Sequence, residues 1–362
     1  MDPPPKTPTS WDPNFNSGLK RGPNALKYRN AELEVLSGVL SVRPIDLTYN
    51  QDRAPFMTKT AWVFPGQGSQ RVGMGLDLLA FPGVKDKFES ASALLGWSVM
   101  DVLLGDEAEL SKTIHTQPCL YIVEAILSDF LKTQGKRPDF VAGHSLGEYS
   151  ALYTAGVFSF EIGLTLIQHR AKLMDTASIG SMAALLGFDR SELEAAIAQT
   201  DDVVLANDNN DGQVVISGTP DAVEALMNRV KSKRAVKLNV SGAFHSPLMA
   251  DAAHSFTQIL NQTTFNTAQI PVLSNTDPTP SLDAEVLKAR LIRQMTGTVR
   301  WREISVNLQE LGVTSGVEVG PGQVLVGIMK RTCKAIAFST VGTAAERSEA
   351  ERSEAEKPGD AA

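Results

Sequence analysis

The sequence is poor in cysteine and histidine and has no long run of apolar residues. Its two cysteines, Cys119 and Cys333, are far apart and lack the spacing of a metal site, which argues against a disulfide framework and favours a reducing compartment. No stretch of about 18 apolar residues occurs, so the chain is not expected to span a membrane. The formal net charge of -7 argues against a general nucleic-acid-binding protein, because phosphate binding needs a positive field. We therefore expect a cytoplasmic protein without metal, membrane or nucleic-acid partners.

The two ends of the 362-residue chain differ from its middle. Residues 1–56 are rich in proline, asparagine and mixed charge, and they contain no apolar core of a signal peptide. We expect this N-terminal extension to be disordered or a gene-model artefact, with Met57 as a candidate initiator. Residues 343–362 repeat ERSEA in tandem and are nearly free of large apolar side chains, which predicts a disordered charged tail. The folded domain is therefore expected at 57–342.

The first part of this domain alternates short apolar segments with stretches of helical periodicity. The pattern predicts a strand within 60–66, a helix at 116–135, a second strand within 138–145, and helices at 146–156 and 161–177. Such alternation is typical of a parallel sheet that is covered by helices on both faces.

Residues 181–240 show a different pattern, with strand and helix segments in the order βαββαβ. Thr219 and Pro220 are residue types preferred at the N-cap and first turn of a helix, and the order of the segments is that of a ferredoxin-like unit. We therefore predict an α/β fold. It comprises an α/β-hydrolase-like core with a parallel sheet, formed by 57–180 and 241–342, and an inserted ferredoxin-like (βαββαβ) small subdomain at 181–240.

The segment GHSLGE (143–148) places Ser145 between two glycines in the spacing G-x-S-x-G. This spacing is typical of a nucleophile on a sharp strand-to-helix turn, although it also arises by chance. A serine hydroxyl needs a base to remove its proton, and histidine is the usual base. We favour His245 among the five histidines, because its loop of small residues (241–249) can present a side chain into a cleft. The remaining candidates are His144, which should point away from its neighbour, and His115, His169 and His254.

An acyl-transfer site also needs backbone N–H groups that face the developing oxyanion. Leu146 follows the serine and occupies the usual position of the first such group. The loop FPGQGSQ (64–70) follows the first predicted strand, and its glycines let the backbone approach a ligand closely. The loop fits neither a dinucleotide nor a phosphate pattern, because Arg71 takes the place of a required glycine and Met74 that of the lysine.

Six motifs occur in order along the chain: FPGQGSQ, GHSLGE, HRAKLM, GAFHSPLM, RQM…VRW and EVGPGQVLVG. Together they closely resemble the malonyl-CoA:acyl carrier protein transacylase family of type II fatty acid synthesis. The acyltransferase domains of polyketide and type I fatty acid synthases are similar. The resemblance covers about residues 57–340. It implies an acyltransferase without a cofactor, whose substrates are malonyl-CoA and holo-acyl carrier protein.

The resemblance also implies roles for residues at matching positions. Ser145 attacks the thioester and carries the malonyl group as an ester in a ping-pong mechanism, while His245 acts as general base and acid. The N–H groups of Gln67 and Leu146 hold the oxyanion. Members of the family orient the histidine with a backbone carbonyl, and the matching position here is Gln294.

Arg170, in HRAKLM, is assigned to the malonyl carboxylate by the same resemblance, since a guanidinium grips a carboxylate through two parallel hydrogen bonds. From spacing alone it reads as a helix-surface cation. Phe244 matches a residue associated with malonyl in the related synthase domains. Glu148 is interpreted as an acid in the first turn of a helix. Asn207 and Asn209 read either as cleft residues or as polar turn residues.

Several alternatives stay open at this level. The same chemistry can serve polyketide synthesis, the elbow can belong to a serine thioesterase or hydrolase, and the fold can be a non-catalytic binding module. We expect a monomer. An acidic carrier protein needs a cationic patch, for which Lys231, Lys233 and Arg234 are candidates; a solvated helix end is the alternative for these three residues.

Overall fold

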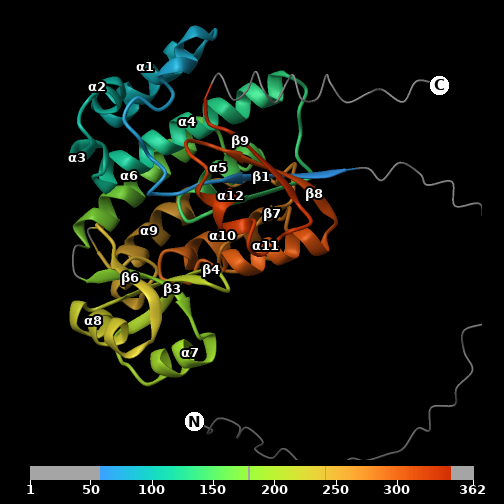
Figure 1. The fold of residues 1–362 in the computed structure, drawn as a ribbon. Coiled ribbons are helices and arrows are strands. Elements are labelled where there is room, and N and C mark those ends of the chain that lie inside the picture. Colours follow the sequence, from blue (N-terminus) through green and yellow to red (C-terminus); the bar gives the residue numbers. More distant parts are fainter. Residues whose placement is uncertain (1–57, 178–179, 241, 344–362) are drawn as a thin grey trace, which may run out of the picture. The chain divides into compact units, whose positions relative to one another are not determined.

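The computed structural model describes residues 58–177, 180–240 and 242–343, which all fall within one compact unit of the chain (Figure 1). The predictions for the N-terminal extension and for the charged tail beyond Thr343 lie outside the described residues. No helix of the described part is long and apolar enough to cross a membrane.

The centre of the fold is a parallel sheet with the strand order β7-β2-β1-β8-β9. Its strands, in chain order, are β1 (Lys59–Phe64), β2 (Phe140–Gly143), β7 (Val272–Leu273), β8 (Val313–Val319) and β9 (Ala337–Val341). The side chains of β1 alternate between the two faces of the sheet. Trp62 and Phe64 pack into one apolar core, whereas Ala61 and Val63 pack into a second core on the opposite face.

Helices cover both faces, as the alternating pattern predicted. The core on the side of Trp62 is built with α1 (Val84–Leu95), α2 (Val99–Leu104), α3 (Glu107–Leu110), α4 (Thr113–Thr133), α5 (Gly147–Thr154), α6 (Phe160–Thr176), α9 (Ala250–Gln262) and α10 (Ala284–Gln294), together with the short 3-10 turns η1 (Leu76–Ala80) and η2 (Pro247–Met249). The core on the side of Val63 is built with α11 (Trp301–Glu310) and α12 (Val324–Met329). The helix predicted at 116–135 corresponds to α4, which begins three residues earlier, at Thr113.

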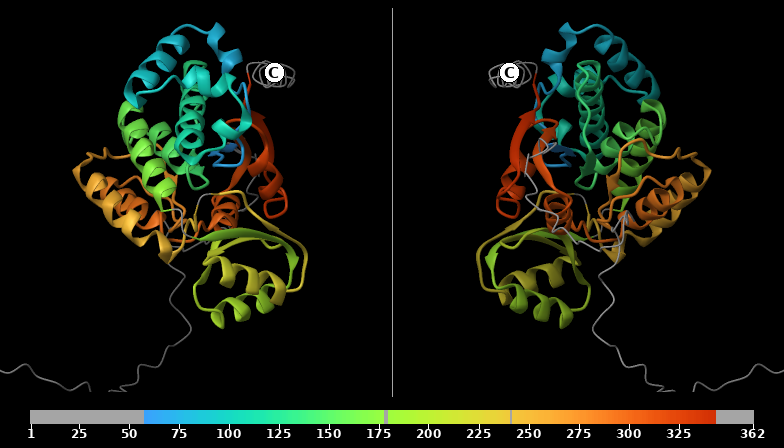
Figure 2. Two further views of the ribbon diagram at one scale, coloured as in Figure 1. Left: turned by 90° about the vertical axis from the view of Figure 1, so that its left-hand side faces the viewer. Right: turned by 90° about the vertical axis from the view of Figure 1, so that its right-hand side faces the viewer.

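A separate antiparallel sheet has the strand order β4-β5-β3-β6. Its elements are β3 (Ser181–Phe188), α7 (Arg190–Ala198), β4 (Val203–Asn210), β5 (Gln213–Gly218), α8 (Pro220–Arg229) and β6 (Ser232–Lys237). Figure 2 shows α7 and α8 together on one face of this sheet, where they enclose a small apolar core. Thr219 caps α8 by accepting a hydrogen bond from the N–H of Ala222.

These observations confirm the predicted α/β class, with a parallel sheet and a βαββαβ unit that carries its own antiparallel sheet. The last strand of that unit lies two residues nearer the N-terminus than the apolar segment 234–240 suggested. The limits of the two predicted subdomains stay a prediction.

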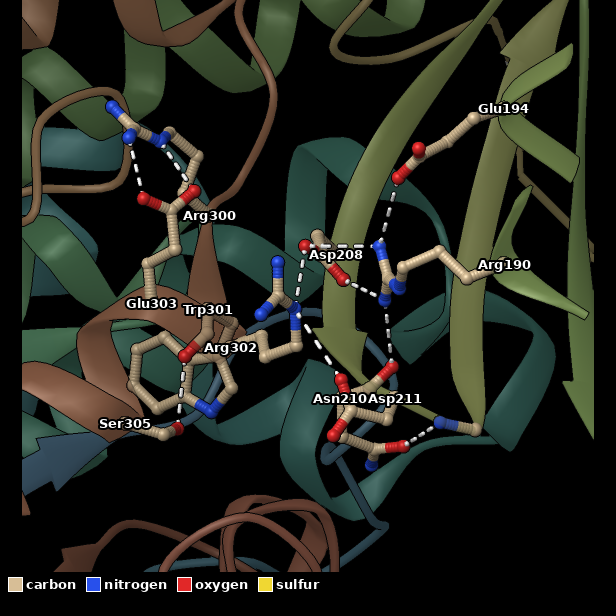
Figure 3. Close-up of polar contacts among 11 residues, drawn as sticks. Arg190, Glu194, Asp208, Asn210, Asp211, Arg300, Trp301, Arg302, Glu303 and Ser305 are labelled. Atoms are coloured by element: carbon tan, nitrogen blue, oxygen red, sulfur yellow. Dashed lines mark hydrogen bonds and ion pairs between the residues drawn. The ribbon is translucent and has the colours of Figure 1, made fainter.

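Strand β4 joins the antiparallel sheet to the region of α11. Backbone hydrogen bonds run from Val299 N–H to Ala206 O (2.8 Å) and from Asp208 N–H to Val299 O (2.9 Å). The buried carboxylate of Asp208 accepts hydrogen bonds from Arg190 (2.8 Å) and from Nε of Arg302 (3.0 Å), as Figure 3 shows. These contacts tie β4, and with it the neighbouring Asn209, to the segment that leads into α11.

Candidate active site

Ser145 lies in the sharp turn between β2 and α5, and its backbone has a positive φ of 50°. The flanking glycines are required by close packing of the backbone. A Cβ atom on Gly143 would lie 1.9 Å from the backbone of Gly147, and one on Gly147 would lie 2.1 Å from the carbonyl oxygen of Phe64. Tight packing therefore holds the turn against the end of β1 and leaves the serine side chain at the C-terminal edge of the sheet.

Asn275 anchors the same turn from the segment that follows β7. Its Oδ1 accepts a hydrogen bond from Ser145 N–H (2.7 Å), and its Nδ2 donates to the carbonyl oxygen of Gly143 (2.6 Å). The side chain is buried. Sequence reasoning missed this residue, because an isolated asparagine carries no spacing signal that relates it to a serine 130 residues away.

His245 faces the serine from the loop before η2. Its Nε2 lies 2.8 Å from Ser145 Oγ, and its Nδ1 lies 2.9 Å from the carbonyl oxygen of Gln294 and 3.2 Å from that of Gly297. Two carbonyl oxygens at Nδ1 require a proton on that nitrogen, so Nε2 is left to accept the serine hydroxyl. Burial, and secondly the charge of Arg170, lower the pKa of His245 to about 3, which keeps the imidazole neutral.

Arg170, on α6, is 1% exposed, so it is not the surface cation that spacing alone suggested. Its guanidinium donates to Gln117 Oε1 (2.8 Å), to Ser145 Oγ (3.0 Å) and to Gln294 Oε1 (3.2 Å), and it lies over the ring of Tyr149. Within the described part of the chain, no carboxylate forms a salt bridge with it, and its Nε has no hydrogen-bond partner. A buried guanidinium without an ion-pair partner can bind an incoming carboxylate.

Glu148 and the side chain of Gln294 complete the polar web beneath the serine. Glu148 is in the first turn of α5 as expected, but it is only 1% exposed. Its Oε2 accepts hydrogen bonds from Gln294 Nε2 (2.7 Å) and from Asn275 N–H (3.2 Å). Gln294 Nε2 also donates to the carbonyl oxygen of Ser145 (2.8 Å). The reading of Glu148 as a first-turn acid missed these contacts, because they join residues distant in sequence.

The N–H groups of Leu146 and Gln67 donate to no acceptor among residues 58–177, 180–240 and 242–343. Leu146 is the N-cap of α5, where the first N–H groups of a helix lack internal partners. The loop with Gln67 lies close by, since a Cβ atom on Gly66 would be 2.5 Å from the carbonyl oxygen of His144. Both candidate oxyanion donors are therefore free of protein acceptors in the described chain.

The remaining predicted residues take different positions. His144 points away from the serine and contacts Asn209 Oδ1 through Nε2 (2.9 Å). Phe244 is buried beside His245, and Asn207 has a buried Oδ1 without a hydrogen-bond partner. The other three histidines take no part in the web: His115 contacts Glu109, and His169 and His254 are exposed on helices. Lys231, Lys233 and Arg234 are exposed at the start of β6.

A family model described as "Acyl transferase domain" matches residues 61–354. The chain belongs to this acyl transferase family. It is 57% identical over 284 residues to the malonyl CoA-acyl carrier protein transacylase of Synechocystis sp. PCC 6803, and the match covers 78% of this chain and 97% of that relative. The corresponding enzyme of Escherichia coli K12 is 40% identical, over 79% of this chain and 96% of its own length. The predicted family and the predicted enzyme class, an acyltransferase, are thereby confirmed.

Solved structures of malonyl-transacylases also match this chain. The crystal structure of the Synechocystis malonyl-CoA:ACP transacylase matches with a TM-score of 0.80 and 55% identity, over 81% of this chain and 100% of that one. A malonyl-transacylase solved in complex with its type II polyketide synthase acyl-carrier protein matches with a TM-score of 0.78 and 38% identity, over 82% of this chain and 100% of that one.

Proposed function

We propose that this acyltransferase moves a malonyl group from malonyl-CoA to the phosphopantetheine thiol of an acyl carrier protein through a malonyl ester on Ser145. One observation carries the proposal. The hydroxyl of Ser145 is contacted at the same time by a neutral base, His245 Nε2, and by a buried cation, Arg170, that has no salt-bridge partner within the described chain. A nucleophile between a base and a carboxylate-binding group suits a substrate that has a thioester at one end and a carboxylate at the other.

In the first half-reaction, Ser145 Oγ attacks the thioester carbonyl carbon while its proton passes to His245 Nε2. The carbonyl oxygen becomes an oxyanion, which the N–H groups of Leu146 and Gln67 stabilise. The intermediate then collapses as the carbon–sulfur bond breaks. The leaving sulfur takes the proton from His245, so free CoA departs and the acyl group remains on the serine as an ester.

The second half-reaction reverses these steps with a different thiol. The carrier protein's phosphopantetheine thiol gives its proton to His245, and the sulfur attacks the ester carbonyl. When the carbon–oxygen bond breaks, Ser145 Oγ regains the proton from His245. The carbonyl oxygens of Gln294 and Gly297 hold Nδ1–H throughout, so His245 keeps one orientation in both directions.

Arg170 provides the preference for a diacid. Its planar guanidinium forms two parallel hydrogen bonds with the distal carboxylate of malonate, and both partners are removed from water. An acetyl or longer alkyl group leaves the buried cation without a partner, which is energetically costly. Phe244 packs beside His245, where the resemblance places a residue associated with malonyl.

The proposal is tested by mass spectrometry of the intact protein after incubation with malonyl-, acetyl- or methylmalonyl-CoA. We expect a malonyl adduct on Ser145 with malonyl-CoA and none in the Ser145→Ala variant. Absence of any adduct on the wild-type chain would reject covalent transfer and favour a non-catalytic binding module.

Two related functions are separated by the acceptor. Incubation with malonyl-CoA alone releases malonate rapidly if the chain is a serine thioesterase or hydrolase, but leaves a stable malonyl ester if it is a transferase. A role in polyketide synthesis has support from a relative named as a polyketide biosynthesis transacylase of Bacillus subtilis, which is 40% identical over 75% of this chain and 96% of its own length. Rates measured with fatty acid and polyketide carrier proteins side by side distinguish the two roles.

A further inference from the structure

We infer that Glu148 is the counter-charge of Arg170, held off from direct contact by the side-chain amide of Gln294, and that it sets how tightly Arg170 binds the malonyl carboxylate. The inference rests on the proposed function, because it concerns the group that Arg170 binds. It makes Glu148 a positioning residue, since Glu148 acts through Arg170 and Gln294 and does not touch the substrate.

The geometry of Gln294 carries the inference. One end of its amide, Nε2, donates to Glu148 Oε2 (2.7 Å), and the other end, Oε1, accepts from Arg170 (3.2 Å). The amide thus lies between a carboxylate and a guanidinium. Its N–H donor faces the carboxylate of Glu148, and its oxygen acceptor faces the guanidinium of Arg170. A reversed amide would place its N–H donors against a guanidinium and its oxygen against a carboxylate, so the two charges fix its orientation.

Glu148 is buried among donors. Gln294 Nε2 and Asn275 N–H both donate to it, and its Oε1 has no hydrogen-bond partner. The two N–H groups and the nearby positive charge of Arg170 favour the ionised form of this carboxyl. Burial raises the pKa of Glu148 above its ordinary value, and the hydrogen bonds from Gln294 and Asn275, the nearby Ser274 hydroxyl and the charge of Arg170 limit this rise.

The amide spacer resolves a conflict in the site. A guanidinium buried without any counter-charge is costly before substrate arrives, but a direct salt bridge would occupy the donors that the malonyl carboxylate needs. An anion one amide away compensates part of the charge and leaves the guanidinium available. The same anion repels the bound malonyl carboxylate, so it weakens malonyl binding.

The test replaces Glu148 with glutamine, which has nearly the same shape. Its side-chain oxygen can still accept from Gln294 and Asn275, so the two hydrogen bonds remain while the charge is lost. Glu124→Gln is the control for replacing a buried acid by an amide of the same shape, because Glu124 is also fully buried but pairs with Ser150. Burial raises the pKa of Glu124 well above its ordinary value, so this control changes the side chain without the loss of charge expected at Glu148. Both variants are made in a Ser145→Ala background, so that binding is measured by calorimetry without turnover.

We expect Glu148→Gln to tighten the binding of malonyl-CoA about tenfold, from the loss of one unit of like charge near the carboxylate. The Kd of free CoA, which has no acyl carboxylate, should not change, and Glu124→Gln should alter neither Kd. A merely structural role for Glu148 predicts weaker binding of both ligands. Unchanged or weaker malonyl-CoA binding in Glu148→Gln overturns the inference.

The outcome also separates this inference from the proposed function. If malonyl-CoA binds to the Ser145→Ala protein more tightly than CoA does, the role of Arg170 stands, and Glu148→Gln then decides the inference alone. If malonyl-CoA and CoA bind equally well to the Ser145→Ala protein, Arg170 does not hold the carboxylate and both ideas fail. A further variant, Gln294→Glu, places an anion directly against Arg170 and should abolish the preference for malonyl-CoA over CoA.

Discussion

Ser145 and His245 are 100 residues apart in sequence, yet Ser145 Oγ and His245 Nε2 lie 2.8 Å apart and both residues have a positive backbone φ. For residues other than glycine, such a conformation costs about 1–3 kcal/mol. Close packing at Gly143 and Gly147 holds the first residue, and two backbone carbonyl oxygens hold the imidazole of the second. The strain is therefore located where the chain must present a nucleophile and its base to each other.

Replacing His245 with alanine should slow malonylation of Ser145 by a factor of about 10²–10⁴, because the hydroxyl loses its base. Rapid-quench mass spectrometry measures this rate directly. His254→Ala is the control, since His254 is exposed on α9 and has no proposed part in the reaction. Equal rates for wild type and His245→Ala would show that another group removes the proton.

Replacing Arg170 with alanine should abolish malonyl transfer and raise the acetyl-to-malonyl ratio, because the distal carboxylate would enter a buried site without a cation. Arg170→Lys tests the same point with the charge retained, and we expect it to remain well below wild type because an ammonium group lacks the two-pronged geometry. Labelling with malonyl- and acetyl-CoA in competition measures the ratio. A preserved preference for malonyl in Arg170→Ala would mean that the carboxylate is bound elsewhere.

The activity of the enzyme should not fall as the pH decreases through about 6.5, as it does when an ordinary histidine becomes protonated. Since burial and Arg170 lower the pKa of His245 to about 3, the neutral base form persists as the pH falls through the ordinary histidine pKa of about 6.5. We expect kcat/KM to stay level between about pH 5 and 7 when a truncated malonyl thioester without phosphate groups is used, so that only the enzyme titrates. Half-maximal activity near pH 6.5 would contradict the assignment of a buried neutral base.

Asn275→Ala should reduce kcat more than it raises KM, because its side chain holds the turn that orients Ser145 and does not contact Arg170, the proposed carboxylate-binding group. The variant leaves the N–H of Ser145 and the carbonyl oxygen of Gly143 without their partner, so the free energy of unfolding should fall by about 1–3 kcal/mol. Steady-state kinetics and denaturant unfolding measure the two effects. Asn275→Asp, which keeps the acceptor for Ser145 N–H, should retain more activity than the alanine variant.

Charge reversal at Lys231, Lys233 and Arg234 should raise the KM for carrier protein while the half-reaction with malonyl-CoA stays unchanged. All three side chains are exposed at the start of β6, where an acidic partner can reach them. Lys85→Glu is the control, because Lys85 is exposed on α1. An unchanged KM for carrier protein would remove these residues from the docking surface and leave them as solvated side chains at the start of β6.

Local sequence patterns were sufficient to predict the main elements around the site. The apolar segments, the cap at Thr219 and the glycines of GHSLGE are signals within a few residues of the structure they specify. Short periodicity predicts the strand before Ser145 and the helix after it. The glycine spacing predicts the sharp turn between them, so the elbow was predictable before any contact was known. The small-residue loop favoured His245 as the base, whereas Arg170 was assigned to the substrate only by the resemblance to the family, because its spacing alone indicated a helix-surface cation.

Tertiary packing decided how those candidates are connected. Asn275, Glu148 and the side chain of Gln294 join segments up to 149 residues apart, and nothing in their own neighbourhoods indicates which partner each would meet. Among the described residues Arg170 is buried without a direct salt bridge, and the amide of Gln294 separates it from Glu148. This arrangement exists only because the parallel sheet brings the ends of several strands and helices to one edge. Short-range periodicity specifies elements and faces, whereas the electrostatic balance of a buried charge depends on everything that surrounds it in space.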